Sequence, residues 1–287
     1  AYAPAFRRRL LRWFRRHGRD LPWRRTRDPY HVIVSEFMLQ QTPAARLIPL
    51  LEAWLTRWPT PAELAAAAPA EAVRLWANLG YPRRALWLHR AASEITEHHD
   101  GVVPRDVEAL LALHGVGDYT ARAVAVFAYG DRHPVVDTNT RRVLARAVRG
   151  RSQPDSPSPR DLVTMEHVLP ADEAAAAMVN AAAMELGALV CTARAPRCAE
   201  CPLRDVCSWR LAGYPDTGDG RRKQARYEGS DRQTRGAILR VLRTHGAFPA
   251  DEVIAGWPDA AQRDRAIDSL IADGLAEASH GLLRLPA

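Results

Sequence analysis

Four cysteines are the residues of this chain whose spacing most directly implies chemistry. They are its only cysteines, and they form a C-x6-C-x2-C-x5-C run at Cys191, Cys198, Cys201 and Cys207. The C-x2-C pair can point two thiolates at one metal centre, and such pairs seldom form disulfides outside redox motifs. Four thiolates without a histidine can hold a [4Fe-4S] cluster or a tetrahedral zinc ion. The spacing favours an iron-sulfur cluster over zinc and leaves both open, with free or oxidised thiols as a further alternative. A purely structural role is the simpler interpretation of the site.

Two carboxyl groups are placed where acid or electrostatic catalysis is possible. The predicted helix 29–41 is apolar nearly all round, so Glu36 is expected to be buried. Burial would raise the pKa of Glu36 and let it serve as a general acid near neutral pH, although a structural ion pair with an arginine is the alternative. Asp137 follows the apolar stretch 134–136 and precedes a predicted helix, so its simplest role is that of a helix N-cap.

A glycine-rich turn is predicted between two helical segments at Leu113-His114-Gly115-Val116-Gly117. Its glycines permit a tight turn and expose backbone N–H groups at the start of the next helix, where a phosphate can bind. An ordinary turn between helices is the alternative interpretation.

The elements that carry these residues are predicted to be helices. Apolar residues recur at three- and four-residue spacing from Pro4 to about Asp172, with no convincing strand alternation. The expected helices are 4–17, 29–41, 44–57, 61–66, 69–78, 82–98, 105–113, 118–129, 138–148, 159–168 and 173–189.

The C-terminal part has a different pattern. Residues 213–230 are poor in apolar anchors and are predicted to be a linker. Beyond them come helices at about 234–244, 250–255 and 260–273, then a hairpin at 275–285 that turns at His280-Gly281. This order predicts a winged-helix-like domain at 231–287, which could bind DNA, bind a protein or only dock.

The charged residues limit the binding partners and the reactions that are possible. The formal net charge of +7 favours a polyanionic partner only weakly. Among the 40 basic residues the sole lysine is Lys223, so no lysine amine for a Schiff base precedes it.

No apolar run of about 18 residues and no signal-peptide pattern is visible, which predicts a cytoplasmic protein without a membrane partner.

Several motifs in one order resemble the helix-hairpin-helix DNA glycosylases of the endonuclease III superfamily and, within them, the adenine DNA glycosylase (MutY) family. The resemblance spans about residues 5–210. It is carried by Leu21-Pro22-Trp23, Ser35-Glu36-Phe37-Met38-Leu39-Gln40-Gln41-Thr42, Leu79-Gly80-Tyr81, Gly115-Val116-Gly117, Val136-Asp137-x-Asn139, Arg142-Val143-Leu144-x-Arg146, Glu185-Leu186-Gly187 and the four cysteines.

The resemblance implies a mainly α, helix-hairpin-helix DNA glycosylase fold. Its six-helix module would span 29–140, and a [4Fe-4S] cluster module would combine 1–28 with 141–212. The small winged-helix-like domain would stand in place of the Nudix-like domain that is usual in the family.

The resemblance also implies roles for four residues near the reaction. Glu36 would protonate adenine N7, and Asp137 would stabilise the oxocarbenium-like sugar with Asn139 as its supporting neighbour. Tyr119 would hydrogen-bond near these groups. Because bifunctional relatives have a lysine at the position of Tyr119, a monofunctional enzyme that leaves an abasic site is expected.

DNA contacts follow by the same resemblance. Tyr81 and Gln41 correspond to the family's wedge and probing residues, and Arg24 to a residue that lines the adenine pocket. Gly115-Val116-Gly117 would hold the DNA backbone. For Tyr81 the alternative is a core aromatic beside Pro82.

The expected function is base excision repair of adenine mispaired with 8-oxoguanine or guanine in double-stranded DNA, by a monomer associated with a bacterial nucleoid. A thymine or uracil mismatch glycosylase is the first alternative, kept open by Ala181, where relatives have a polar residue. The second alternative is a non-catalytic DNA-damage-binding protein that uses the fold as a platform.

Overall fold

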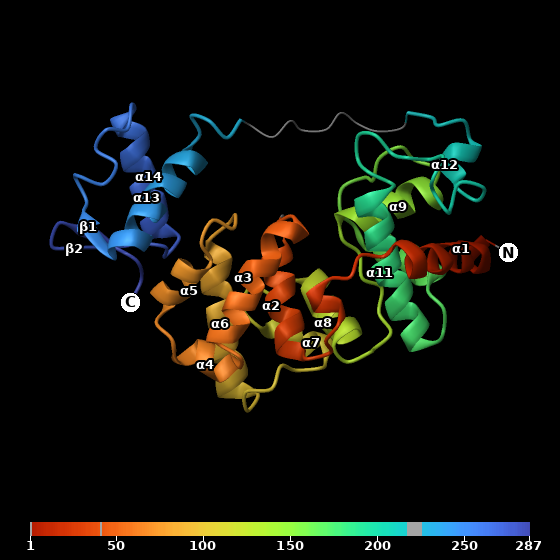
Figure 1. Cartoon of the computed structure of the whole chain (residues 1–287), viewed down its shortest axis with the longest axis horizontal. Helices are drawn as coiled ribbons and strands as arrows, with labels where there is room; N and C mark the ends of the chain where they lie inside the picture. The colour runs from red at the N-terminus through yellow and green to blue at the C-terminus, as the bar shows by residue number, and fades with distance from the viewer. Residues whose placement is uncertain (1, 41, 217–225) are drawn as a thin grey trace. The chain divides into compact units, whose positions relative to one another are not determined.

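The computed structural model describes residues 2–40, 42–216 and 226–287, and these residues are mainly helical (Figure 1). The chain forms two compact units, one of residues 1–33, 105–111 and 116–221 and one of residues 34–104, 112–115 and 222–287. They are called below the cysteine unit and, after the wedge residue that the resemblance implies at Tyr81, the wedge unit. The predicted division into modules at 1–28, 29–140, 141–212 and 231–287 remains a prediction.

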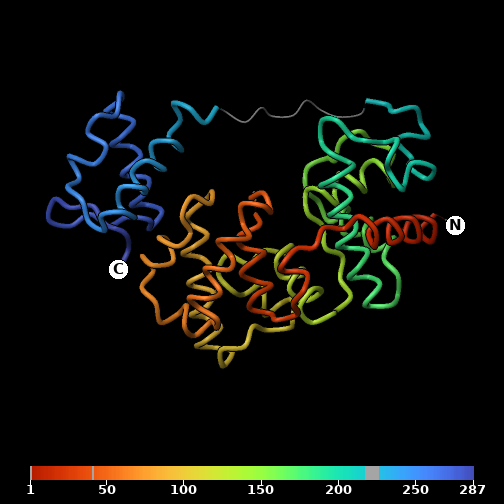
Figure 2. Tube along the Cα trace, viewed as in Figure 1, coloured from red at the N-terminus to blue at the C-terminus, as the bar shows by residue number. Residues whose placement is uncertain are grey.

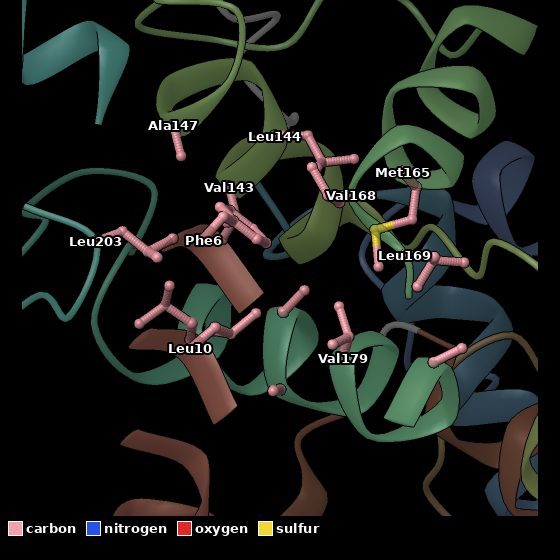
Figure 3. Packing of buried hydrophobic residues seen from close by; sticks show 14 of the residues in the cluster. Phe6, Leu10, Val143, Leu144, Ala147, Met165, Val168, Leu169, Val179 and Leu203 are labelled. Carbon is pink, nitrogen blue, oxygen red and sulfur yellow. The ribbon is translucent and has the colours of Figure 1, made fainter. Parts of the chain in front are cut away.

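The cysteine unit joins both ends of its sequence range around one core. Helix α1 (Tyr2–His17) packs on α11 (Glu173–Leu189), as Figure 2 shows in red and green, and α9 (Thr138–Ala147) packs on α11, α10 (Pro159–Val168) and α12 (Ser208–Leu211). The unit also contains η1 (Pro22–Arg24), most of α7 (Val107–Ala112) and α8 (Asp118–Phe127). The side chains between these helices are apolar and fully buried, among them Phe6, Leu10, Leu144, Met165 and Val179 (Figure 3).

The wedge unit is built on a second set of helices. They are α3 (Ala44–Arg57), α4 (Pro61–Ala66), α5 (Pro69–Leu75) and α6 (Arg83–His98), and α4 and α5 pack on α6. Trp54 meets the rings of Trp58 and Trp76 edge-on, at centroid distances of 4.8 and 5.8 Å. Helix α2 (Pro29–Leu39) contributes its second half to this unit. Helix positions predicted from periodicity are confirmed to within a few residues.

The C-terminal residues form a winged-helix pattern of α13 (Asp231–His245), β1 (Ala247–Pro249), α14 (Ala260–Ala272), β2 (Glu277–Ser279) and β3 (Leu282–Arg284). The three strands form an antiparallel sheet in the order β1-β3-β2. The predicted turn at His280-Gly281 is confirmed, and both residues have the positive φ that tight hairpin turns require.

Two details of this region were not predicted correctly. Strand β1 was missed, because three residues are too short to display alternation. The expected helix at 250–255 is a series of turns instead, in which Val253 and Glu252 donate backbone hydrogen bonds to Pro249 and Ala255 donates to Glu252. Gly256 and Pro258 follow closely and leave no room for a helix to propagate.

Within the wedge unit, the winged-helix residues contact α5 and α6. Arg243 of α13 donates from Nε to the carbonyl of Val73 at 3.1 Å, and burial lowers the pKa of Arg243 to about 10. Asp273 accepts hydrogen bonds from both Arg83 and Arg235, at 3.0 and 2.6 Å. These contacts dock the C-terminal residues on α5 and α6 of the same unit.

Among the described helices, none is both long and apolar enough to cross a membrane.

Candidate functional site

Glu36 lies in the middle of a buried helix, as predicted. Helix α2 starts at Pro29, where Asp28 accepts the backbone N–H of His31 at 2.9 Å and so caps the helix. Only 5% of Glu36 is exposed, and its neighbours Ser35 and Phe37 are buried as well. The predicted burial of Glu36 is therefore confirmed, and its role as a general acid remains a prediction.

Tyr81 is exposed rather than part of a core. Its exposed fraction is 51%, so the core-aromatic interpretation is wrong. Its φ is +55°, a left-handed conformation that bulky residues rarely adopt. Pro82 follows as the N-cap of α6. An exposed aromatic ring on a constrained backbone is suited to insertion between bases.

Beneath Tyr81 lies Arg84, which sequence reasoning did not single out. Its guanidinium is buried and donates to the carbonyl oxygens of Phe37 at 2.9 Å, Gln40 at 2.6 Å and Gly80 at 2.9 Å. The predicted probing residue Gln41 lies outside the described residues.

The glycine-rich turn contains one glycine that the fold cannot replace. Gly115 has φ +75°, and a Cβ there would stand 2.7 Å from Trp87 Cβ and 3.2 Å from Phe37, the neighbour of Glu36. Gly117 is the N-cap of α8 and has open space around its Cα, while Val116 between them is buried. Gly117 and Asp118 are exposed, so the start of α8 is open to solvent, as a phosphate-binding turn requires.

Asp137 and Asn139 are brought together in the cysteine unit. Asp137 Oδ1 accepts the backbone N–H of Thr140 at 2.6 Å, so the predicted N-cap of α9 is confirmed. Its other oxygen, Oδ2, accepts from Asn139 Nδ2 at 2.8 Å. Asn139 Oδ1 in turn accepts from Arg142, whose guanidinium also donates to the carbonyls of Gly187 and Cys191 at 2.7 and 2.6 Å. These bonds fix the direction of the Asp137 carboxylate.

Helix α11 comes close to Asn139, and this close approach depends on Gly187 of that helix. A Cβ on Gly187 would stand 2.7 Å from both Cβ and the backbone oxygen of Asn139. Asn180 is fully buried two turns before Gly187 on α11. It accepts the N–H of Val135 at 2.9 Å and donates to the carbonyl of His133 at 3.0 Å, which fixes the backbone that leads to Asp137. A polar residue within an alanine-rich helix is the sequence signal that could have indicated this supporting role of Asn180.

Tyr119 packs from α8 against Ala123, Val126 and Val135. Val135 lies two residues before Asp137, so the tyrosine packs on the segment that leads to that carboxylate. Its side chain supplies a phenol where a lysine would supply an amine.

Arg24 is held by a buried carboxylate. Glu185 is 1% exposed and accepts from Arg24 Nη2 at 2.9 Å and from Arg19 Nε at 2.8 Å. Burial alone would raise the pKa of Glu185, but hydrogen bonds from Arg19 and Arg24 outweigh it and lower this pKa to about 2. The Arg24 guanidinium also lies 5.3 Å from the centre of the Phe14 ring. Arg24 thus has a packing role whether or not it contacts a base.

The four cysteines line one pocket, which is partly open to solvent and also bordered by Arg146 and Trp209. In the described part of the chain, no three His, Cys, Asp or Glu side chains are grouped as a site for a single metal ion. The pocket is lined by all four thiols and by no histidine or carboxylate, a donor set that fits an iron-sulfur cluster.

Arginines surround this pocket. Arg146 lies 3.5 Å from Cys191 Sγ and donates to the carbonyl of Thr192 at 2.7 Å. Burial raises the pKa of the Cys191 thiol while Arg146 acts in the opposite direction, and burial raises the pKa of Cys201 to about 12. Cations beside the thiolates of a bound cluster would offset this burial and the negative charge of the thiolates.

Comparison with known proteins agrees with this geometry. Residues 34–164 match the family described as HhH-GPD superfamily base excision DNA repair protein, and residues 191–207 match the iron-sulfur binding domain of endonuclease III. The cofactor predicted for the cysteines, a [4Fe-4S] cluster, is confirmed by the second match together with the curated relatives.

Curated relatives extend the match over most of the chain. The adenine DNA glycosylase of Mycobacterium tuberculosis is 55% identical over 272 residues, which cover 93% of this chain and 88% of the relative. That of Mycolicibacterium smegmatis is 54% identical and is covered to 91%. The thymine-DNA glycosylase of Aeropyrum pernix is 38% identical over 71% of this chain.

Solved structures share the fold. A thermostable thymine-DNA glycosylase superposes with a TM-score of 0.67 at 26% identity, over 74% of this chain and 97% of that one. A trapped endonuclease III–DNA covalent intermediate superposes with a TM-score of 0.63 at 21% identity, over 73% and 95%. The predicted helix-hairpin-helix glycosylase fold is thereby confirmed, and the chain belongs to the adenine DNA glycosylase family.

Proposed function

We propose that this protein is a monofunctional DNA glycosylase that hydrolyses the N-glycosidic bond of adenine mispaired with 8-oxoguanine or guanine. Substantial identity to adenine DNA glycosylases over 93% of the chain supports the substrate base. The observation that carries the chemistry is the pair of carboxyl groups: Glu36, buried in an apolar helix, and Asp137, oriented by two hydrogen bonds.

The reaction divides between these two groups. The protonated Glu36 carboxyl donates its proton to N7 of the extruded adenine, and the electrons of the C1′–N9 bond move into the base as it leaves. Asp137 carries the negative charge that stabilises the oxocarbenium-like C1′ until water adds there, and the proton that the water loses restores the protonated form of Glu36. Adenine and an abasic site are the products.

Supporting groups keep Asp137 in place for that step. Asn139 and the N–H of Thr140 occupy both carboxylate oxygens, so the side chain has one preferred direction rather than a set of rotamers. Tyr119 offers a phenol in place of an amine, and the only lysine, Lys223, lies outside the described residues. We therefore expect base release without strand cleavage.

The partner is double-stranded DNA, bound by one copy of the chain near the bacterial nucleoid. Tyr81 would fill the space left by the flipped nucleotide, Arg24 would line the base pocket, and Gly115-Val116-Gly117 would contact the backbone. The [4Fe-4S] cluster, held by Cys191, Cys198, Cys201 and Cys207, would organise the loops of residues 191–207.

The test is base release from matched duplexes that contain A:8-oxoguanine, A:G, A:C, T:G or U:G. The expected result is adenine release, fastest opposite 8-oxoguanine, without strand breaks when heat and alkali are omitted. Glu36→Gln should slow release by about 100- to 10,000-fold, the usual contribution of a general acid. Glu52→Gln, an exposed acid on α3, is the matched control and should be unchanged.

Two outcomes would contradict the proposal. Release of thymine or uracil alone would move the chain to the mismatch-pyrimidine branch, which the 38% identity to a thymine-DNA glycosylase keeps as second candidate. Binding to lesion duplexes with no release from any of them would identify a damage-binding protein instead.

A further inference from the structure

Arg84 is a buried cation surrounded by neutral dipoles. Its side chain is 3% exposed, and its guanidinium donates to three carbonyl oxygens, those of Phe37, Gln40 and Gly80. None of the ion pairs formed by the described residues includes Arg84. Burial accordingly lowers the pKa of Arg84, to about 10. Because isolated buried charges are destabilising, an arginine here needs a reason beyond packing.

The three acceptors lie on two separate segments. The carbonyls of Phe37 and Gln40 lie at the C-terminal end of α2, where the last carbonyls of a helix lack helical partners and carry the negative end of its dipole. Gly80 is in the loop before α6 and also accepts the indole N–H of Trp76 at 3.3 Å. One guanidinium thus links the helix that carries Glu36 to the loop that carries Tyr81.

The same guanidinium supports the ring of Tyr81. Its central carbon atom lies 5.3 Å from the centre of that ring, within the range of a cation–π contact, while Tyr81 as a residue remains 51% exposed. The backbone of Tyr81 has φ +55°, which costs free energy and persists only where surrounding contacts impose it. Arg84 provides such contacts on both sides of this residue, through Gly80 and through the ring.

We propose that Arg84 is a positioning residue that links the end of the Glu36 helix to the Tyr81 loop and holds Tyr81 in its exposed, left-handed conformation for insertion into DNA. This inference rests on the proposed function, because the use of Tyr81 as a wedge does. Arg84 acts through Tyr81 and the α2 carbonyls and does not itself contact the base.

A double-mutant cycle on the intact protein tests the link. Single-turnover adenine release from an A:8-oxoguanine duplex is measured for wild type, Arg84→Met, Tyr81→Ala and the double variant, with 2-aminopurine fluorescence beside the target as the readout of unstacking. We expect Arg84→Met to slow release by about 10- to 100-fold, the scale of a displacement of about 1 Å, and to lower the fluorescence gain. The double variant should be no slower than the slower single variant.

Two further variants separate positioning from folding. Arg84→Lys keeps the charge but cannot reach three carbonyls with a planar fork, so it should recover only part of the rate. Arg90→Met removes an exposed arginine of the same helix and should leave release within about twofold of wild type. Multiplicative effects of Arg84→Met and Tyr81→Ala, or unchanged fluorescence gain in Arg84→Met, would overturn the inference.

A measurement without DNA keeps the inference distinct from the proposed function. If Arg84 imposes the left-handed conformation, Tyr81→Gly should raise the melting temperature by a few degrees in wild type, since glycine tolerates positive φ. In Arg84→Met the same change should give no gain. Equal gains in both backgrounds would refute the link even if the enzyme is active, and absence of base release from wild type would refute only the proposed function.

Discussion

Two buried arginines, Arg84 in the wedge unit and Arg142 in the cysteine unit, perform related tasks with different partners. Arg142 donates to the carbonyls of Gly187 and Cys191 and to Asn139 Oδ1. The Asn139 side chain in turn donates a hydrogen bond to the Asp137 carboxylate. Arg84 donates to backbone carbonyls at the end of a helix and in a loop.

The difference corresponds to what each arginine must hold. The proposed role of Asp137 requires one fixed direction of its carboxylate, and the Arg142 network provides it through side chains attached to rigid helices. The proposed role of Tyr81 requires an exposed ring on a strained backbone, and Arg84 is the residue that we propose as the source of that restraint. The cysteine unit is therefore expected to be more sensitive to any change that separates its helices.

Arg142→Met should have the largest effect. It leaves three carbonyl or amide oxygens near Cys191 without the donor that Arg142 supplies, and each buried acceptor left unsatisfied costs about 1–3 kcal/mol. We expect weaker visible absorbance from the cluster, together with loss of adenine release. Arg12→Met, an exposed arginine of α1, is the control. A normally loaded and active Arg142→Met would remove the distinction between the two arginines.

Glu185→Gln should have the second-largest effect. The substitution leaves Arg19 and Arg24 without their shared buried carboxylate, and breaking such a pair costs about 3 kcal/mol. Urea unfolding at pH 7 measures the loss. Glu173→Gln, an exposed acid in the first turn of the same helix, should change stability by less than about 0.5 kcal/mol.

The same carboxylate predicts a pH dependence of stability. Because its folded-state pKa is lowered from 4.5 to about 2, its contribution is complete above pH 4.5 and is lost as the pH falls toward about 2. Unfolding curves between these pH values should show a larger decrease for wild type than for Glu185→Gln. Parallel decreases in both proteins would contradict the assignment of this pKa to the Arg19 and Arg24 contacts.

Gly187→Ala tests the close approach of α11 to Asn139. The added Cβ would stand 2.7 Å from the backbone oxygen of Asn139, so one helix must shift, at a cost of about 1–3 kcal/mol. Adenine release should fall more than stability, because the shift moves the support of Asp137. Gly256→Ala, which meets nothing within 4 Å, is the control. Unchanged release would mean that Asp137 tolerates the displacement.

Asp273→Asn should have the smallest effect. Its partners Arg83 and Arg235 are partly exposed, and pairs of this kind contribute about 0–1 kcal/mol. A fall in melting temperature of less than about 4 °C is expected, with release unchanged. A loss of adenine release would instead show that the docked C-terminal residues influence the Tyr81 loop through Arg83.

Sequence patterns alone were sufficient for the local features of this protein. Helix limits follow from short-range periodicity, and Asp137 was predicted as an N-cap because capping involves residues only three positions apart. The cysteine run identified a metal site for the same reason, since its ligands lie within one short segment. The burial of Glu36 was predicted from the apolar residues on every side of its own helix.

Features that depend on distant partners were visible only in the tertiary structure. Nothing near Arg84 in sequence indicates that it reaches carbonyls more than 40 residues away, and the Glu185 carboxylate meets arginines more than 160 residues before it. Strand β1 exists because β3 pairs with it. The sequence by itself determined which segments are helices and which side chains are capable of chemistry, because both depend on residue type and local periodicity. Only the tertiary structure decided which buried polar groups are paired, because pairing across the core depends on how the helices pack.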